Sequence, residues 1–508
     1  MTQDKFRKHC IVVGGGTSGW LSACYLKAAL ADQIDITIID PDKDENIGVG
    51  ESTLPTIHKT LRTLDIPLQT FLRETNGTIK QGITFKQWLK NGSNFYHPYD
   101  ITKHIGIKNL FDAWYASGRK NSFSDFASLQ PTAIRENKSP FRLEKNSALI
   151  ACFNHSLHVD SKEITRFLKE HSRKLKINHL PHKVAKVTRK QDGVESLTLD
   201  NGIEIRGDIY IDCSGFKRIL SDRNSQYQHF KFLPCDTAIA TSVKHEQADI
   251  SPTTTATAHD SGWLWDIPLY TRRGVGCVFS QAHMSLDQAH QTLTKHFGGS
   301  IDDNSLKIIP FRAGNLTQPW EGNVINIGLS AGFIEPLEST GIYFIEEALH
   351  LLESIFPLKH QTWAQNKFNK EMTERYQECA DFVYLHYLLS DRDDSQFWRE
   401  FKDPANIPDH IKDILDFWEG TPPSNSHFTN GRQIFGLPAH EYILYGMNFL
   451  PKTYIESNNI SPESKQSNSF SQNPINSLQS IDLLLDHKSF LDVAFGKIQP
   501  KDALLNHF

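Results

Sequence analysis

The chain has 508 residues, and at about 150 residues per domain this length predicts roughly three domain-equivalents, which excludes peptide, knottin and zinc-finger classes. Its 54 Lys and Arg against 59 Asp and Glu give a net charge of −5, so we expect no nucleic-acid partner and no anionic membrane surface. Hydrophobic residues at 39% and charged residues at 22% are typical of a globular enzyme, and no apolar stretch reaches the roughly 18 to 20 residues of a membrane span.

The first forty residues alternate in a recognisable order. A β-branched run at 11–13 precedes three glycines, a helix-length segment at 20–30 and a second β-branched run at 34–40. This order predicts a βαβ unit. The basic and apolar residues at 5–13 imitate a signal peptide, but the glycines interrupt the apolar run at once.

Later segments extend this pattern. Residues 208–212 and 323–327 have strand character, and each runs into a glycine-containing turn, so we expect these distant strands to share one sheet. Apolar residues recur at helical spacing over 340–356 and 363–389, which predicts a mainly helical C-terminal half.

The end of the chain changes composition. Residues 457–480 are rich in Ser, Asn, Gln and Pro and lack the apolar area that offsets ordering entropy, which predicts a loop or linker. We expect the amphipathic stretch 481–485 to dock back as a terminal helix.

Cysteine usage indicates the compartment. The seven cysteines are odd in number, scattered and never spaced CxxC, which favours neither a disulfide framework nor a zinc site. No HExxH or other clustered ligand spacing occurs, so we expect no metal site. Together with the lack of a membrane segment, this predicts a soluble protein of the reducing cytoplasm.

A glycine pattern follows the first strand. Gly14, Gly16 and Gly19 match GxGxxG, and Asp40 ends the next strand 21 residues beyond Gly19. Gly14 permits a tight turn, Gly16 lets backbone N–H groups approach a pyrophosphate, and Gly19 allows close helix packing. Asp40 would accept a hydrogen bond from a ribose hydroxyl. The alternative is a glycine-rich turn that binds nothing, but three glycines cost backbone entropy without stabilising a core.

FAD and NAD share this pattern, so the choice between them depends on other segments. Residues 211–216 resemble the second strand-to-glycine motif of the FAD-dependent hydroxylase superfamily, and residues 326–331 occupy the place of its third. The resemblance favours FAD and implies an α/β fold, with a Rossmann-like FAD-binding domain and a mainly helical substrate-binding region.

An aromatic strand narrows the chemistry. In the segment 262–268, Trp263 and Trp265 stand at i and i+2, on one face of an extended chain, and are followed by Ile267 and Pro268. Alone, this segment indicates an aromatic strand that packs a core. Combined with the FAD pattern, it resembles the WxWxIP motif of flavin-dependent halogenases of the tryptophan halogenase family, and the resemblance covers roughly residues 9–450.

Three further stretches support the resemblance. Residues 47–53 resemble the glycine-rich flap over the flavin. Residues 77–85 resemble the segment with the catalytic lysine, and residues 335–342 the segment with the catalytic glutamate and the halide site. Beyond Gly14, Gly16, Gly19 and Asp40, the cofactor contacts that we expect are Thr17, Ser18, Val49, Gly50, Val184, Leu329 and Ile342.

The resemblance implies that FADH₂, O₂ and chloride or bromide give hypohalous acid, which travels inside the protein to a separate aromatic site. Lys80 would receive it, either by a hydrogen bond or as a haloamine, and the sequence leaves both forms open. Glu338 would lie across from Lys80, stabilise the cationic ring intermediate and accept its proton. Thr340 and Gly341 would offer backbone N–H groups to the halide at a helix start.

The aromatic motif would separate cofactor from substrate. The resemblance implies that Trp263, Trp265, Ile267 and Pro268 form a wall that keeps the ring away from the flavin, which prevents direct hydroxylation. The domain prediction follows: a discontinuous FAD-binding module at 1–350, with 80–150 contributing to the substrate site, and a substrate-side region at 351–508.

The substrate pocket departs from the family pattern. Residues 95–99 resemble the stretch whose aromatic residues sandwich the indole, so His97 and Tyr99 are candidate stacking residues; an aromatic-rich loop is the alternative. Residues 435–448 lack the family's Tyr-Tyr pair and the Trp after the glutamate. Glu441 would still pair with an ammonium group and Asn448 with a carboxylate. The departure implies a free indole, so the expected substrate is tryptophan or another indole.

The expected partners are a separate flavin reductase that supplies FADH₂, a small aromatic substrate and a second copy of the chain in a homodimer. Two other functions stay open. An FAD-dependent aromatic monooxygenase would leave the tryptophan wall, Lys80 and the Glu338 segment unexplained, and a non-catalytic flavin-binding module would give no halide-dependent product.

Overall fold

The computed structural model describes residues 7–42, 49–100, 110–144, 148–221, 225–245, 249–298, 301, 306–356, 361–428, 433–458, 460 and 481–500. The chain forms two compact units, each built from three segments. The first comprises residues 1–77, 157–231 and 310–377, and the second comprises residues 78–156, 232–309 and 378–508. The two units are defined by how the chain packs. The predicted modules at 1–350 and 351–508 are defined by the ligand that each would bind, and they stay a prediction.

The first unit contains a six-stranded, mainly parallel sheet, and only its edge strand β22 is antiparallel to its neighbour. The predicted strands at 11–13, 34–40, 208–212 and 323–327 all lie in it, which confirms that distant segments share one sheet. Its order is β10 (Asn178–Leu180), β2 (Ile34–Ile39), β1 (Lys8–Val13), β14 (Ile209–Asp212), β23 (Val324–Asn326) and β22 (Trp320–Glu321).

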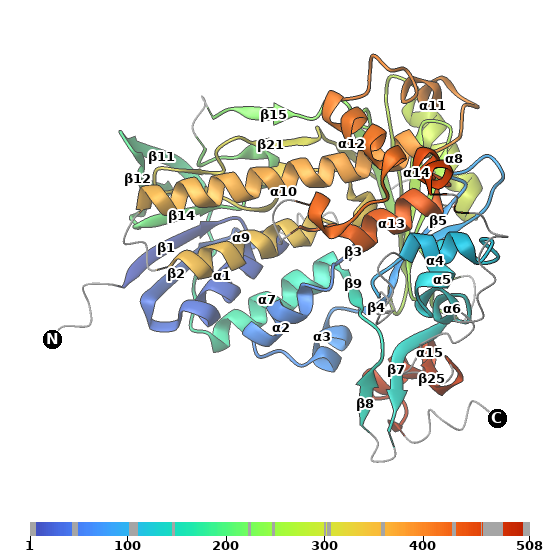
Figure 1. Cartoon of the computed structure of the whole chain (residues 1–508). Helices are drawn as coiled ribbons and strands as arrows, with labels where there is room; N and C mark the ends of the chain where they lie inside the picture. The colour runs from blue at the N-terminus through green and yellow to red at the C-terminus, as the bar shows by residue number, and fades with distance from the viewer. Residues whose placement is uncertain are drawn as a thin grey trace. The chain divides into compact units, whose positions relative to one another are not determined.

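Helices accompany this sheet (Figure 1). The predicted helix at 20–30 is α1 (Thr17–Leu30), which packs against α7 (Ser161–Lys174) and α9 (Gly341–Ile355). The helices predicted at 340–356 and 363–389 are α9 and α10 (Gln361–Leu389), so both predictions are confirmed.

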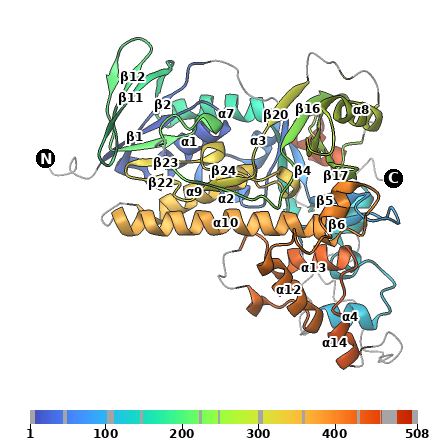
Figure 2. The same ribbon diagram turned by 90° about the horizontal axis from the view of Figure 1, so that it is seen from above.

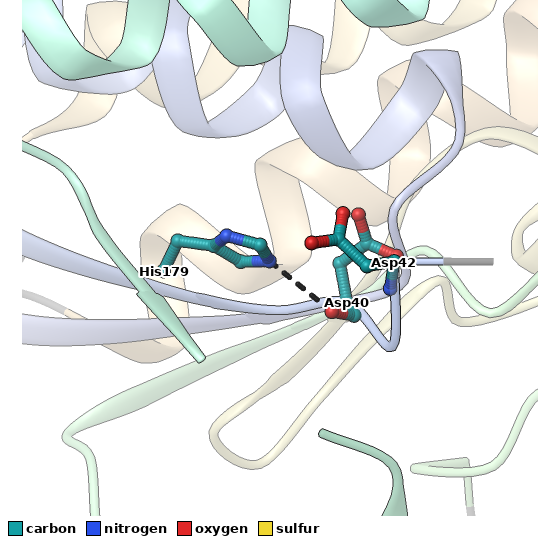
Figure 3. Close-up of side chains that lie close together, drawn as sticks. All are labelled: Asp40, Asp42 and His179. Atoms are coloured by element: carbon teal, nitrogen blue, oxygen red, sulfur yellow. Dashed lines mark hydrogen bonds between the residues drawn. The ribbon is translucent and has the colours of Figure 1, made fainter. Parts of the chain in front are cut away.

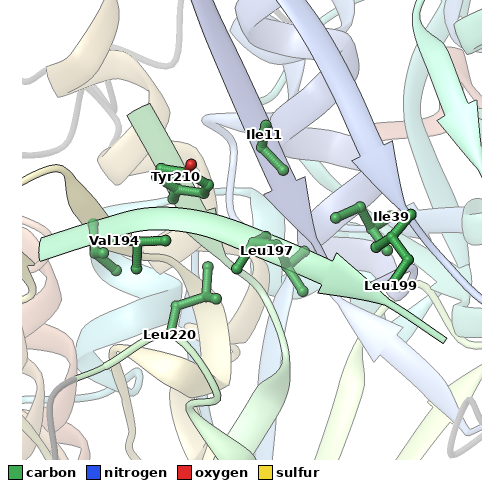
Figure 4. Close-up of a cluster of buried hydrophobic side chains, with 9 residues drawn as sticks. Ile11, Ile39, Val194, Leu197, Leu199, Tyr210 and Leu220 are labelled. Carbon is green, nitrogen blue, oxygen red and sulfur yellow. The ribbon is translucent and has the colours of Figure 1, made fainter. Parts of the chain in front are cut away.

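A buried apolar cluster joins the sheet to a smaller one, and Figure 4 shows its side chains. The cluster takes Ile11 and Val13 from β1, Ile39 from β2, and Val194, Leu197 and Leu199 from β12. The smaller sheet has the order β11 (Val184–Lys190), β12 (Gly193–Leu199) and β13 (Glu204–Ile205).

The other described elements of this unit are short. They are η1 (Ala31–Gln33), β3 (Gly50–Ser52), α2 (Ile57–Thr63), α3 (Leu68–Glu74), β9 (Ser156–Asp160), η2 (Gly215–Lys217), β15 (Tyr227–His229), β21 (Gly314–Leu316), η4 (Gly328–Ser330), β24 (Gly332–Phe333) and η5 (Pro336–Glu338).

The second unit is built on a seven-stranded mixed sheet. Its order is β20 (Lys307–Pro310), β16 (Thr237–Val243), β19 (Arg273–Phe279), β18 (Gly262–Pro268), β17 (Thr254–His259), β5 (Gly82–Lys86) and β6 (Phe95–Pro98). Helix α8 (Leu286–Phe297) buries Ala289, Leu293 and Phe297 against β16 and β19, and Figure 2 shows it beside β16. Strand β4 (Thr78–Lys80) precedes β5.

Short helices complete this unit. They are α4 (Leu110–Ala116), α5 (Phe123–Ala127), α6 (Gln130–Arg135), α11 (Gln396–Glu400), α12 (Asp409–Gly420), η6 (Asn425–His427), α13 (Leu437–Gly446) and α14 (Lys452–Ser457). Among the helices in the described ranges, none has both the length and the apolar character to cross a membrane.

The prediction of a terminal helix at 481–485 is wrong. Residues 481–483 form a 3-10 turn, η8 (Ile481–Leu483), and the chain then continues as β25 (Leu484–Asp486), which pairs with β7 (Lys138–Leu143) beside β8 (Leu149–Ala151). The helix, α15 (His487–Ala494), begins only after this strand. Leu484 is fully buried there, so strand pairing outweighs the local helical pattern. Most of the predicted linker, residue 459 and residues 461–480, lies outside the described residues.

Candidate active site

The glycine turn closes tightly against the parallel sheet. Gly14 has φ +118°, and a Cβ atom there would lie 2.3 Å from the carbonyl oxygen of Cys213. A Cβ atom on Gly19 would lie 1.8 Å from the carbonyl oxygen of Gly14. Both glycines are therefore required by close backbone approach.

The N-terminus of α1 is open to an anion. Gly16 is its N-cap residue with extended backbone, no side chain caps the helix, and its first turn contains no acidic residue. The N–H groups of this turn and the helix dipole favour a phosphate group. The Ser18 hydroxyl donates to Cys213 Sγ at 3.3 Å and to the Ile327 carbonyl at 3.0 Å, so it holds α1 to the sheet.

Asp40 lies directly beside the glycine turn. A Cβ atom on Gly15 would overlap the Asp40 carboxyl group, so Gly15, which the GxGxxG pattern does not include, leaves room for this carboxyl group. The Asp40 side chain is 7% exposed and accepts a hydrogen bond from Trp20 Nε1 at 3.3 Å.

Asp40, Asp42 and His179 approach one another closely enough for one ligand atom from each to lie within 4.8 Å of the others (Figure 3). Their polar atoms already have protein partners. His179 Nε2 bonds the Asp40 backbone oxygen at 3.1 Å, and Asp42 forms an ion pair with Lys169. These contacts account for the cluster without an ion.

The predicted flap is partly a strand. Gly50 begins β3, which pairs with β9, and Ser161 donates to the Val49 carbonyl through its hydroxyl at 2.6 Å. Burial raises the pKa of Glu51 to about 7, while a hydrogen bond from the Thr17 hydroxyl opposes this shift. Ile47 and Gly48 lie outside the described residues.

Three further predicted cofactor residues belong to this unit. Val184 packs against the apolar cluster that contains Ile39. Leu329 lies in η4, whose Gly328 has φ +73° and faces the Ser18 side chain, and Ile342 is buried in the first turn of α9.

The segment before α9 places a carboxyl group beside a helix start. Glu338 ends η5 and is 1% exposed, and Ser339 follows in the left-handed region with φ +63°. Thr340 is the N-cap residue of α9, which has no side-chain cap and no acidic residue in its first turn. Gly341 is exposed, and no atom lies within 4 Å of the position of a Cβ atom. The arrangement leaves room for a small anion.

In the second unit, Lys80 is completely buried at the end of β4. Its ammonium nitrogen lies 5.2 Å from the centroid of the Tyr99 ring. Gly82, with φ +152°, allows this arrangement, because a Cβ atom there would lie 2.4 Å from the His97 carbonyl oxygen. The pairing of β5 with β6 therefore brings Lys80 and the 95–99 segment together.

The aromatic strand is β18, within the sheet. Trp263 and Trp265 have ring centroids 6.3 Å apart, and Ile267 and Pro268 are buried at its end. A Cβ atom on Gly276 of β19 would lie 2.1 Å from Trp265 Cζ2, so a glycine that the sequence did not single out makes room for this indole. Thr78 Oγ1 donates to the Pro268 carbonyl at 2.6 Å, which links the Lys80 strand to this strand.

His97 is buried among aromatic rings. Its ring centroid lies 5.9 Å from that of Phe382, 6.4 Å from Phe435 and 6.1 Å from Tyr442. Phe382 and Phe435 stack at 4.0 Å, and the sequence singled out neither residue, although Phe435 begins the stretch 435–448 that it assigned to the substrate pocket. The only available signal was their aromatic character.

The two predicted clamp residues differ in their surroundings. Glu441 of α13 is 6% exposed, and burial raises its pKa to about 8. Asn448 lies beyond the helix end, is exposed, and accepts a hydrogen bond from Arg119 at 3.2 Å. Gly446 lies against Phe95, where a Cβ atom would be 3.0 Å from the ring. The structure does not bring Glu441 and Asn448 to one buried site.

Comparison with known families places these observations in context. The family model described as tryptophan halogenase matches residues 9–463. A 7-chloro-L-tryptophan 6-halogenase, KtzR, from Kutzneria sp. (strain 744) is 30% identical over 462 residues, which cover 85% of this chain and 89% of the relative.

Two solved structures are similar over nearly the whole chain. The tryptophan halogenase from Shewanella frigidimarina NCIMB 400 has a TM-score of 0.87 at 26% identity, with 98% of this chain and 99% of the other covered. BrvH, a flavin-dependent halogenase from Brevundimonas sp. BAL3, has a TM-score of 0.80 at 28% identity, with 96% and 99% covered.

Proposed function

This chain belongs to the tryptophan halogenase family, and we propose that it is a two-component flavin-dependent enzyme that halogenates an indole with reduced FAD, O₂ and chloride or bromide. A separate reductase would supply FADH₂. The observation that carries the proposal is the complete burial of the Lys80 amine against the Tyr99 ring. A surface lysine would lose any hypohalous acid to water, whereas a buried one retains it.

The first unit suits FAD. The open N-terminus of α1 would bind the pyrophosphate, Asp40 the ribose, and Val184 the apolar part of the adenosine end. Val49, Gly50, Leu329 and Ile342 would contact the rest of the cofactor. Reduced FAD, when bound, would supply two of the four electrons that O₂ accepts, and the halide would supply the other two and become hypohalous acid, with water as the second product. We assign a discontinuous flavin module to residues 1–350, in which 80–150 contributes to the substrate site, and a further substrate-side region to residues 351–508.

Two groups would act on the substrate. The Lys80 ammonium would hold the hypohalous acid through a hydrogen bond and polarise its halogen, or, once deprotonated, hold the halogen as a haloamine. Glu338 would stabilise the positive charge on the attacked ring and then accept the ring proton. Thr340 and Gly341 would hold the halide through their N–H groups, since the α9 N-terminus has no side-chain cap.

The tryptophan strand favours a halogenase over a monooxygenase. Trp263, Trp265, Ile267 and Pro268 are all buried in β18, which a hydrogen bond from Thr78 links to the strand of Lys80, and a wall there would keep the ring from the flavin. His97 and Tyr99 would stack on the indole. Glu441 would contact the substrate side chain. Asn448 would hold a carboxylate through its amide N–H groups, because its oxygen already accepts a hydrogen bond from Arg119.

The test compares Lys80→Ala with Lys86→Ala, an exposed lysine at the end of β5. Each variant receives FADH₂ from an added reductase, O₂, bromide or chloride, and indole or tryptophan, and the product is measured by mass spectrometry. We expect Lys80→Ala to lose at least about 100-fold in halogenation, with flavin binding retained, and Lys86→Ala to match the native chain.

Other outcomes identify the alternatives. Native turnover in Lys80→Ala would remove this lysine from the mechanism. An oxygenated product that forms without halide would identify a monooxygenase, and flavin binding without any product would identify a binding module.

A further inference from the structure

Helix α13 presents two buried polar groups on one face, one helical turn apart. Glu441 and Tyr445 stand at i and i+4, and they are 6% and 3% exposed. The Glu441 carboxyl raises the pKa of Tyr445 beyond the effect of burial, which places the two groups within electrostatic reach.

Neither group has a hydrogen-bond partner in the described part of the chain. The Tyr445 hydroxyl is buried and makes no hydrogen bond there, although Asp112 of α4 lies near enough to affect its pKa. Glu441 likewise makes no hydrogen bond or ion pair with a described residue. Buried polar groups in proteins nearly always have a partner, so two such groups on one face indicate a ligand.

The walls around these groups are apolar and aromatic. The Tyr445 ring lies 4.9 Å from Phe111, 5.7 Å from Trp114 and 4.7 Å from Phe123, measured between centroids. The described charged or titratable groups that affect Tyr445 are Glu441, Asp112 and Tyr454, and none of them is a cation.

We propose that Glu441 and Tyr445 form a subsite that selects an indole whose side chain ends in an uncharged hydrogen-bonding group, such as a hydroxyl or an amide. The inference rests on the proposed function and names the substrate class of that site. A protonated carboxyl and a phenol each donate and accept one hydrogen bond, which a hydroxyl or an amide matches in both directions.

The observations that favour an uncharged group are electrostatic. Burial without a cation raises the pKa of Glu441 to about 8, so its carboxyl is mostly protonated at pH 7. An ammonium group would have to displace that proton, and its hydration would be replaced mainly by aromatic rings. Helix α13 packs on β6, and Tyr442, the residue next to Glu441, lies 6.1 Å from the His97 ring, measured between centroids, so the two polar groups belong to the helix that borders the His97 site.

The first experiment compares tryptophol, 3-ethylindole and tryptamine as substrates at pH 7. Tryptophol and 3-ethylindole differ by the side-chain hydroxyl, and tryptamine replaces that hydroxyl with an ammonium. We expect kcat/KM for tryptophol to exceed that for each of the others by about tenfold, as one additional hydrogen bond would give. A preference for tryptamine that Glu441→Gln abolishes would overturn the inference and identify an ammonium site.

The second experiment assigns the preference to the two residues. Tyr445→Phe should lower the tryptophol to 3-ethylindole ratio toward one, whereas Tyr115→Phe, in the same aromatic cluster, should leave the ratio unchanged. Glu441→Gln should keep the preference, because an amide also donates and accepts, and Glu441→Leu should lose it. A ratio that Tyr445→Phe leaves unchanged would contradict the inference.

A stability measurement separates binding from folding. Tyr445→Phe removes a hydroxyl without a partner, so its Tm should equal or exceed that of the native chain. Tyr442→Phe should lower Tm, because the Tyr442 hydroxyl donates to the Asp100 carbonyl at 2.7 Å. If the native chain halogenates none of the three indoles, the proposed function itself fails, which is distinct from a missing preference.

Discussion

At the scale of single residues, burial sets the protonation of several carboxyl groups. Glu346 of α9 is fully buried, and it accepts hydrogen bonds from Thr60 Oγ1 at 2.6 Å and Thr56 Oγ1 at 2.7 Å. Burial raises its pKa from 4.5 to about 7 in spite of both hydroxyls. At pH 6 the Glu346 carboxyl is therefore mostly protonated in the folded chain and mostly ionised in the unfolded chain.

This difference predicts a pH-dependent stability. Below pH 4.5 Glu346 is protonated in both the folded and the unfolded chain, so it does not change the free energy of unfolding with pH. Because its pKa is higher in the folded chain, the free energy of unfolding falls by up to about 3 kcal/mol as the pH rises from 4.5 to 7. Glu346→Gln should remove this loss, so its stability relative to the native chain should increase over that range.

Urea unfolding at pH 5, 6 and 7.5 measures this effect. Glu170→Gln, an exposed position on α7, serves as the control and should follow the native chain. A Glu346→Gln variant with the same pH dependence as the native chain would show that the buried carboxyl stays ionised.

At the scale of elements, the turn between β1 and α1 depends on backbone that approaches backbone. Gly14 and Gly202 both have positive φ, at +118° and +84°, but only Gly14 faces other atoms closely. No atom lies within 4 Å of a Cβ position at Gly202. An alanine at Gly202 therefore tests backbone strain alone, whereas an alanine at Gly14 tests backbone strain together with steric overlap.

Gly202→Ala should cost about 1 kcal/mol, the cost of a left-handed backbone for a residue with a Cβ atom. Gly14→Ala should cost several times more and weaken FAD binding, because its Cβ atom overlaps the Cys213 carbonyl and moves the turn. Chemical unfolding and flavin fluorescence titration check both effects. Equal losses in the two variants would mean that the turn relaxes without consequence.

At the scale of the whole molecule, the thiols report the packing of both units. All seven cysteines are free, and every one except Cys152 is buried. Burial raises the pKa of the Cys24 and Cys213 thiols to about 12, so these two thiols stay protonated while the chain is folded, and burial keeps reagents from the other buried thiols.

Titration with a thiol reagent should therefore label one cysteine per folded chain and seven in denaturant. Cys152→Ser should abolish the reaction of the folded chain without changing its Tm by more than a degree or two. Rapid labelling of several thiols in the native chain would show that one of the units opens readily.

The sequence predicted what depends on neighbours along the chain. The strands at 11–13 and 34–40, the helix at 20–30 and the glycine turn all follow from local hydrophobic periodicity and from backbone freedom, and the structure confirms these elements. The resemblance likewise supplied Lys80 and Glu338 as candidates, because their flanking residues are adjacent in sequence.

Contacts between distant segments were decided only by the tertiary structure. The local pattern of 481–485 predicts a helix, but the edge of β7 pairs with residues 484–486 as a strand. The need for a glycine at 276 follows only from the Trp265 ring that packs against it. Only the packed structure shows that Glu441 and Tyr445 make no hydrogen bond with any residue in the described ranges. Periodicity determines which face of an element is buried, but the identity of the group that covers each buried atom depends on long-range packing, which no local pattern contains.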